Sequence, residues 1–225
     1  MQSDHLIALG DSHLEALKFA ADLRLLDVGS NCFEIVPGAT VVGLRNPNSL
    51  TDAVNIFKRS LLSQPVASHV LIHLGEVDCG FVMWWRAKKM GESVEVQLKE
   101  SLYAYRQFLS ELMESGFDKI CVTGASLPTI RDGIDMGQVS NKRSEIVVGI
   151  RERTELTSRY NAGLKELAAV YRLSYFDFCD VLVDRETRVV HDFFRNPDPT
   201  DHHLDKTKIV AIWADKCNSF VNGLL

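Results

Sequence analysis

Short apolar runs alternate along the whole chain with longer segments of helical periodicity, and this alternation constrains the fold more than any other feature. The apolar runs have the length and composition of buried strands and cover residues 5–9, 32–36, 66–74, 119–123 and 173–178. The helical segments follow them and cover residues 14–26, 49–61, 94–114, 146–171 and 206–221. Strands and helices in this order predict an α/β fold: a parallel sheet of about five strands with helices on both faces.

The sequence shows no internal repeat, low-complexity tract or linker, so we expect one domain over residues 1–225. The segment from Gly124 to Ser144 has few periodic apolar residues and is expected to be a long loop or lid.

Charge and composition exclude several classes of partner. The formal net charge is −5 and the basic residues are scattered, which argues against a nucleic-acid partner. No apolar run reaches the roughly 18 to 20 residues that span a bilayer, and the N-terminus lacks the features of a signal peptide. The five cysteines form no CxxC pair and are expected to be buried free thiols in the cytoplasm. The oligomeric state stays open.

Three unusual segments follow expected strands: Gly10–His13, Pro37–Gly38 and Gly75–Asp78. Ligands of open parallel sheets bind at the carboxyl ends of the strands, where these segments should lie. Ser12 stands at the turn into the first helix, where free N–H groups and the helix dipole stabilise negative charge. This position suits a nucleophile, although Ser12 could equally serve as a helix N-cap.

A second polar segment, Asp198–Leu204, precedes the last helix. A serine nucleophile needs a base, and a histidine oriented by a carboxylate is the usual one. Adjacent His202 and His203 among aspartates provide both groups. The alternative is a polar loop in which Asp201 caps the helix.

In this order the segments resemble the blocks of the SGNH/GDSL hydrolase family. The first block matches Gly10-Asp11-Ser12, the second contains Gly38, the third falls at Gly75–Asp78, and the last falls at Asp201–Leu204. The resemblance implies a flavodoxin-like three-layer α/β/α sandwich with Ser12 as the nucleophile. It also implies an oxyanion hole that includes the N–H groups of Ser12 and Gly38.

The resemblance implies that Asp201 orients His203 as the base, since Leu204 follows His203 as it does in the family. His202 with Asp198 is the second choice, because neither histidine has the usual Asp-x-x-His spacing.

The third block departs from the family pattern. Val77 replaces the asparagine whose amide is the third oxyanion donor, and losing such a donor costs on the order of 100- to 1000-fold in rate. Asn46, Asn48 or Arg86 are candidates to replace it.

Other residues near these blocks are candidates for substrate binding. They are Asp11, His13, Glu76, Asp78, Trp85 and Arg86. The pair Trp84-Trp85 with Arg86 would form a wall for a carbohydrate or acyl group, although such aromatic residues are more often buried.

These features predict a serine esterase or acyl (acetyl) transferase that acts on a small or carbohydrate-type ester. No dinucleotide-binding or Walker A motif is present, so we expect no organic cofactor, and this interpretation needs no metal. An α/β-hydrolase is excluded because no Gly-x-Ser-x-Gly elbow occurs.

Two other functions stay open. Asp11-x-His13 also begins the motif of two-metal phosphoesterases, in which Asp201, His202 and His203 would add ligands. The loss of the third-block asparagine alternatively suits a catalytically weakened binding protein of glycan metabolism.

Overall fold

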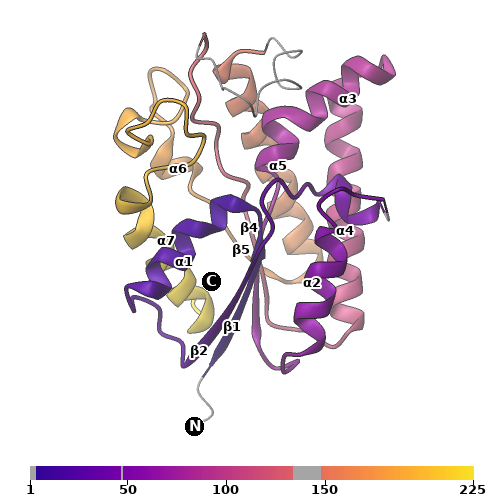
Figure 1. Ribbon diagram of the computed structural model, residues 1–225, viewed down its shortest axis with the longest axis vertical. Coiled ribbons are helices and arrows are strands. Elements are labelled where there is room, and N and C mark those ends of the chain that lie inside the picture. The colour runs from indigo at the N-terminus through magenta and orange to yellow at the C-terminus, as the bar shows by residue number, and fades with distance from the viewer. Residues whose placement is uncertain (1–3, 47, 134–147) are drawn as a thin grey trace.

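Five parallel strands form one sheet in the order β2-β1-β3-β4-β5 (Figure 1). A computed structural model of the chain describes residues 4–46, 48–133 and 148–225. The strands are β1 (His5–Gly10), β2 (Ser30–Ile35), β3 (His69–His73), β4 (Ile120–Thr123) and β5 (Ser174–Phe176). The expected α/β class is therefore confirmed, and all five carboxyl ends meet at one edge of the sheet.

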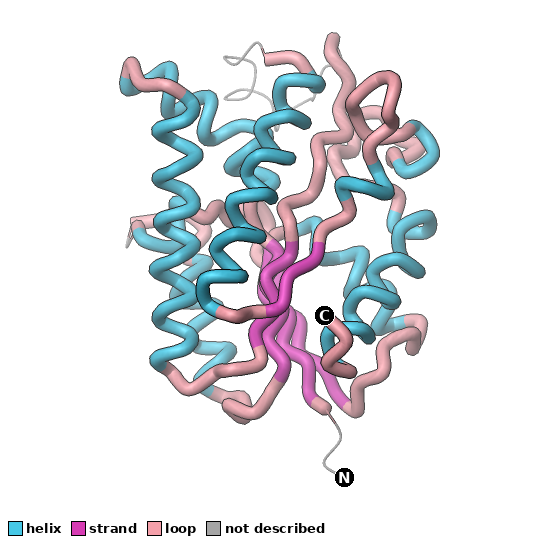
Figure 2. Tube along the Cα trace, turned by 180° about the vertical axis from the view of Figure 1, so that it is seen from behind, coloured by secondary structure: helices cyan, strands magenta, loops and turns pink. Residues whose placement is uncertain are grey.

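Helices cover both faces of this sheet, as Figures 1 and 2 show from opposite sides. One face carries α1 (Glu15–Asp22) and α7 (Lys206–Val221). The other carries α2 (Ala53–Leu62), α4 (Val94–Glu114) and α5 (Ile150–Tyr171). The short helices α3 (Met83–Met90) and α6 (Cys179–Leu182) lie toward the carboxyl edge of the sheet.

Alternate side chains of each central strand enter two separate hydrophobic cores. In β1, Ile7 and Leu9 pack with the face covered by α2, α4 and α5, whereas Leu6 and Ala8 pack with α1 and α7. All four are fully buried, which explains why the strand is a continuous apolar run.

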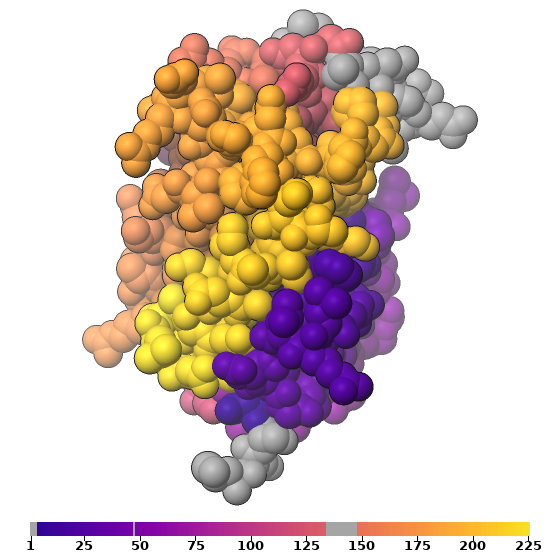
Figure 3. Space-filling view, turned by 90° about the vertical axis from the view of Figure 1, so that its left-hand side faces the viewer, coloured from indigo at the N-terminus to yellow at the C-terminus, as the bar shows by residue number. Residues whose placement is uncertain are grey.

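Helix α1 lies beside α7, so the two ends of the chain are neighbours (Figure 3). Leu17 of α1 and Trp213 of α7 are both buried in the core between these helices and the sheet. This packing brings the turn before α1 and the segment before α7 to the same edge of the sheet.

Several element boundaries differ from the sequence-based expectation. Ser12–Leu14 forms a 3-10 turn before α1, and its N-cap is Asp11, whose side chain accepts from the His13 N–H, rather than Ser12. Likewise Asp205, not Asp201, caps α7. The segment between residues 181 and 201 contains the end of α6 and a 3-10 turn at Asp192–Phe194. The expected loop at 124–144 has neither helix nor strand over 124–133, and its remainder lies outside the described residues.

Among the residues that the structure describes, no helix is both long enough and apolar enough to cross a bilayer. All five cysteines are free thiols. Cys79, Cys121 and Cys217 are buried as expected, but Cys32 and Cys179 are only half-buried.

The end of β1 packs closely against β3 at Gly10, and a substitution at this residue tests that packing. A Cβ at this position would lie 2.5 Å from the carbonyl oxygen of His73, a backbone atom that cannot move away without disturbing the sheet. We expect Gly10→Ala to lower the free energy of unfolding by about 1–3 kcal/mol, measured by urea denaturation. Gly149→Ala is the control, because its φ is −64° and a Cβ there would meet no atom closer than 3.4 Å. An equal or smaller loss for Gly10→Ala would contradict this packing.

His73 makes stability depend on pH. Burial lowers the pKa of His73 from an ordinary 6.5 to about 4. Its Nδ1 and Nε2 lie 2.7 Å from Thr123 Oγ1 and 3.0 Å from Ser126 Oγ. Because the unfolded chain binds the proton first, stability falls as the pH drops below about 6.5 and continues to fall to about 4.

We expect the free energy of unfolding to fall by up to about 3 kcal/mol more in the native protein than in His73→Asn between pH 7 and about 4. Urea denaturation at a series of pH values measures this difference. Parallel pH profiles for the two proteins would show that His73 does not carry the effect.

Candidate active site

Ser12 lies on the 3-10 turn that leaves the carboxyl end of β1. The turn is fixed at Asp11, whose N–H donates to the carbonyl of His73 at 3.2 Å and whose carboxylate accepts from the N–H of His13 at 2.9 Å. Ser12 itself is half-buried. Its hydroxyl is therefore positioned by rigid backbone while it remains reachable.

His203 lies against Ser12 across the edge of the sheet. The His203 Nε2 is 2.8 Å from Ser12 Oγ, and its Nδ1 is 2.6 Å from Asp201 Oδ1. The same Asp201 oxygen accepts from the His203 N–H at 2.9 Å, so an aspartate only two residues away can orient the ring. This geometry provides a path for the Ser12 proton to an imidazole whose far side faces a carboxylate.

Asp201 is held as a carboxylate. Burial alone raises its pKa, but hydrogen bonds from the backbone and ring of His203 outweigh this and keep the pKa below its ordinary value. The amide of Asn196 also donates to Asp201 Oδ2 at 2.8 Å. Both oxygens are thus hydrogen-bonded, and the group is negative at neutral pH.

The second-choice pair, His202 and Asp198, is not arranged in this way. Asp198 accepts from the N–H and hydroxyl of Thr200. The carbonyl of His202 accepts from the Thr129 hydroxyl at 2.7 Å, which fixes the backbone of this segment. Of the two histidines, the structure places His203 against Ser12.

Asp11 and His13 form a second aspartate–histidine pair, and it lies beside the pair Asp201 and His203. His13 Nδ1 is 3.2 Å from Asp11 Oδ1, and its Nε2 is 3.4 Å from the carbonyl of His202. Burial lowers the pKa of His13, but the hydrogen bond to Asp11 and the charges of Glu76 and Asp11 prevail and raise it to about 9. Asp11 and His13 are both buried; Asp11 contacts His13, whose ring also lies against His202 and His203.

Glu76 and Asp78 follow β3 and are also buried. The carboxylate of Asp78 accepts from the N–H groups of Val41 and Val42 and from the hydroxyl of Ser101. Asp78 was expected to contact substrate, but it is fully buried and anchors the loop that follows β2.

The two positions linked to an oxyanion hole lie at the same edge. Gly38 is exposed and has a φ of +72°, a conformation that favours glycine. It follows Val36, whose N–H donates to the carbonyl of Gly10 at 2.9 Å, so the end of β2 is tied to the start of the Ser12 turn. Val77, in the third block, is half-buried and has no side-chain donor.

Trp85 and Arg86 lie on α3. The Arg86 Nε donates to Gln97 of α4 at 2.7 Å, and the ammonium of Lys89 lies 4.5 Å from the Trp85 ring centroid. Asn46 accepts from the N–H of Asn48. Trp85, Arg86, Asn46 and Asn48 are all absent from the lining of the cavity next to Ser12.

That cavity has a volume of about 530 Å³ and opens between α1 and α7. Ser12, His13, Asp201 and His203 line it, together with residues that the sequence analysis did not single out. These are Glu15, Ala16, Ser126, Asn196, Pro197, Asp205, Lys206, Thr207 and Trp213. Ser126 had a detectable signal, since it follows a strand as Ser12 does; the lining residues of α1 and α7 had none.

Comparisons with known proteins support the fold. Neither protein-family models nor curated protein sequences match the chain. Solved structures do. A GDSL-like lipase from Bacteroides thetaiotaomicron has a TM-score of 0.61 at 12% identity, over 99% of this chain and 89% of that one.

Two solved structures of carbohydrate esterases are similar to this chain in fold at equally low sequence identity. A carbohydrate acetylesterase from Sinorhizobium meliloti has a TM-score of 0.58 at 13% identity, over 99% of this chain and 100% of that one. An acetylxylan esterase from Geobacillus stearothermophilus has a TM-score of 0.56 at 14% identity, over 97% and 94%. The chain therefore has the fold of the SGNH/GDSL hydrolases.

Proposed function

We propose that the protein is a serine esterase or acyltransferase in which Ser12, His203 and Asp201 form a catalytic triad. The observation that carries this proposal is the continuous hydrogen-bonded path from Ser12 Oγ through His203 to Asp201, at 2.8 and 2.6 Å. The path joins opposite ends of the chain at the edge of the sheet where ligands bind.

In the first step, His203 Nε2 takes the Ser12 proton while Ser12 Oγ attacks the carbonyl carbon of an ester. The Asp201 carboxylate stabilises the imidazolium that forms. His203 then gives the proton to the leaving alcohol, and an acyl-Ser12 intermediate remains. Water or an acceptor hydroxyl then attacks the acyl carbon while His203 takes its proton, and His203 returns that proton to Ser12 Oγ as the acyl group leaves.

The N–H groups of Ser12 and Gly38 are the oxyanion donors in this proposal. With Val77 in place of an amide, the site has one donor fewer than the family pattern. Donors of this kind are each worth about 2.7–4 kcal/mol in other hydrolases, so we expect a modest rate.

The cavity offers polar groups to the alcohol part of an ester, within a lining that is mostly apolar. The leaving oxygen must approach His203, and the polar side chains of Glu15, Asn196 and Lys206 line the space beside that ring. Charged and amide groups of this kind suit the hydroxyls of a carbohydrate. The names of two of the structural neighbours, a carbohydrate acetylesterase and an acetylxylan esterase, agree with an acetyl ester of a sugar.

Ser12→Ala and His203→Ala test the triad. Each removes a group that takes part directly in bond making, so we expect hydrolysis of p-nitrophenyl acetate to fall at least about a thousandfold in both. Release of p-nitrophenol at pH 8 measures the rate, and circular dichroism verifies that the variants are folded.

His202→Ala is the matched control, since it removes the neighbouring imidazole and should leave most of the activity. Full activity in Ser12→Ala would overturn the proposal. Activity lost in His202→Ala but kept in His203→Ala would move the base to His202. If the intact protein does not turn over this ester or acetylated sugars, with or without an acceptor, the weakened binding protein becomes the better account.

A further inference from the structure

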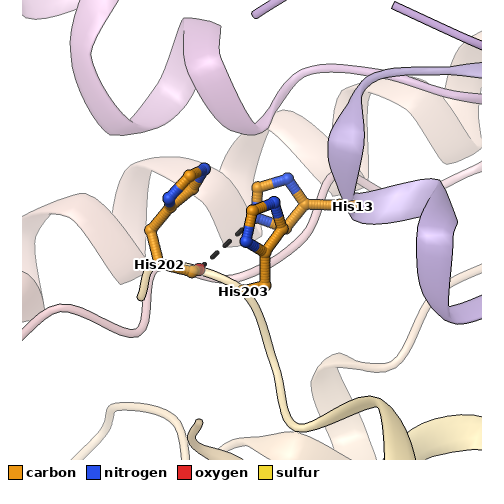
Figure 4. A group of neighbouring side chains, drawn as sticks. All are labelled: His13, His202 and His203. Carbon is orange, nitrogen blue, oxygen red and sulfur yellow. Dashed lines mark hydrogen bonds between the residues drawn. The ribbon is translucent and has the colours of Figure 1, made fainter. Parts of the chain in front are cut away.

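The segments Asp11–His13 and Asp201–His203 bring three imidazole rings together (Figure 4), and one of these rings, that of His203, contacts Ser12 Oγ at 2.8 Å. The ring centroids of His202 and His203 are 4.0 Å apart, those of His13 and His203 are 4.6 Å apart, and those of His13 and His202 are 5.2 Å apart. One ring nitrogen of each lies within 4.8 Å of the others. The chain thus gathers three strong metal-ligating groups in one place.

The separation of these nitrogens is close to what a metal needs. Imidazole nitrogen suits zinc, and Zn–N bonds of about 2.0–2.1 Å in tetrahedral geometry place ligand nitrogens about 3.3–3.4 Å apart. The ring nitrogens lie within 4.8 Å of one another, so zinc binding requires the rings to turn toward a common point. His202 and His203 are half-buried, so their rings have room to move.

Two of the three rings contact a carboxylate through Nδ1. Asp11 Oδ1 lies 3.2 Å from His13 Nδ1, and Asp201 Oδ1 lies 2.6 Å from His203 Nδ1. When the Nδ1 atoms donate to these oxygens, the Nε2 atoms face the shared space as ligands. Metal-binding histidines are commonly oriented by carboxylates in this way.

The surrounding charge favours a dication. Asp11 Oδ2 and Glu76 Oε2 are buried and have no hydrogen-bond partner among the described residues. Both acidic groups act electrostatically on His13. Three carboxylates, with Asp201, therefore surround three imidazoles, and positive charge placed among the rings would be stabilised.

We propose that His13, His202 and His203 form an inhibitory zinc site, with His13 and His203 binding through Nε2. On His13 the zinc ion replaces the proton that faces the carbonyl of His202. On His203 it takes the lone pair that would otherwise accept the Ser12 proton. This second consequence rests on the proposed function, whereas the binding itself does not.

Direct binding of Zn²⁺ tests the site without reference to activity. In calorimetric titration at mildly alkaline pH, we expect one equivalent to bind the intact protein. His202→Ala and His203→Ala should each weaken binding at least about tenfold, as should His13→Gln if it folds. His5→Ala is the control, because it removes an imidazole from the other end of β1 and should leave binding unchanged.

Ser12→Ala separates the two proposals. It removes the proposed nucleophile but no zinc ligand, so it should bind zinc as the intact protein does. Visible bands of Co²⁺ typical of tetrahedral coordination, absent in His202→Ala, would support the ligand set. If the esterase is active, zinc should abolish its activity and EDTA should restore it. No saturable binding, or affinities within twofold of the intact protein in both His202→Ala and His203→Ala, would overturn the site.

Discussion

The hydrogen bond between Ser12 Oγ and His203 Nε2 depends on how the two ends of the chain are held together. Ser12 precedes α1 and His203 precedes α7, and the two helices pack side by side over one face of the sheet (Figure 3). Leu17 and Trp213 are buried in this layer. A loss of packing there would separate Ser12 from His203 without altering either residue.

Hydrogen bonds also fix the Ser12 turn and the His203 segment to neighbouring parts of the sheet edge. The Ser12 turn is tied to β3 through the carbonyl of His73 and to the end of β2 through Val36. The His203 segment is tied to the loop after β4 through Thr129. The ends of β2 and β3 and the loop after β4 therefore help to fix the position of the candidate triad. Asp78 anchors the loop that follows Gly38.

Much of this arrangement could be predicted from the sequence because it follows from local patterns. Apolar runs and helical periodicity predict the order of strands and helices, and the helix at 94–114 begins and ends where expected. The strand-end rule brings Ser12, Gly38 and Glu76 to one edge. The position before the last helix predicts that Asp201, His202 and His203 lie near this edge, and the resemblance to the SGNH/GDSL family implies His203 as the base.

Tertiary packing determines what the sequence could not show. Asp78 resembles a substrate ligand in the sequence, yet its hydrogen bonds to Val41 and Val42 depend on a loop that only folding brings near. Trp85 and Arg86 lie on α3, where Lys89 of the same helix contacts the Trp85 ring and Gln97 of α4 accepts a hydrogen bond from Arg86. The contact of His13 with both His202 and His203 joins distant parts of the chain, and no spacing predicts it.

The central claim is that His203 makes Ser12 nucleophilic, and covalent labelling tests it most directly. A fluorophosphonate reacts with activated serines whatever the natural substrate is, so its use does not require the acyl group or acceptor to be known. The account predicts that mass spectrometry will find one modification, on Ser12, in the metal-free protein, and that His203→Ala will not be labelled. An unlabelled Ser12 in the folded, metal-free protein, or equal labelling in His203→Ala, would contradict it.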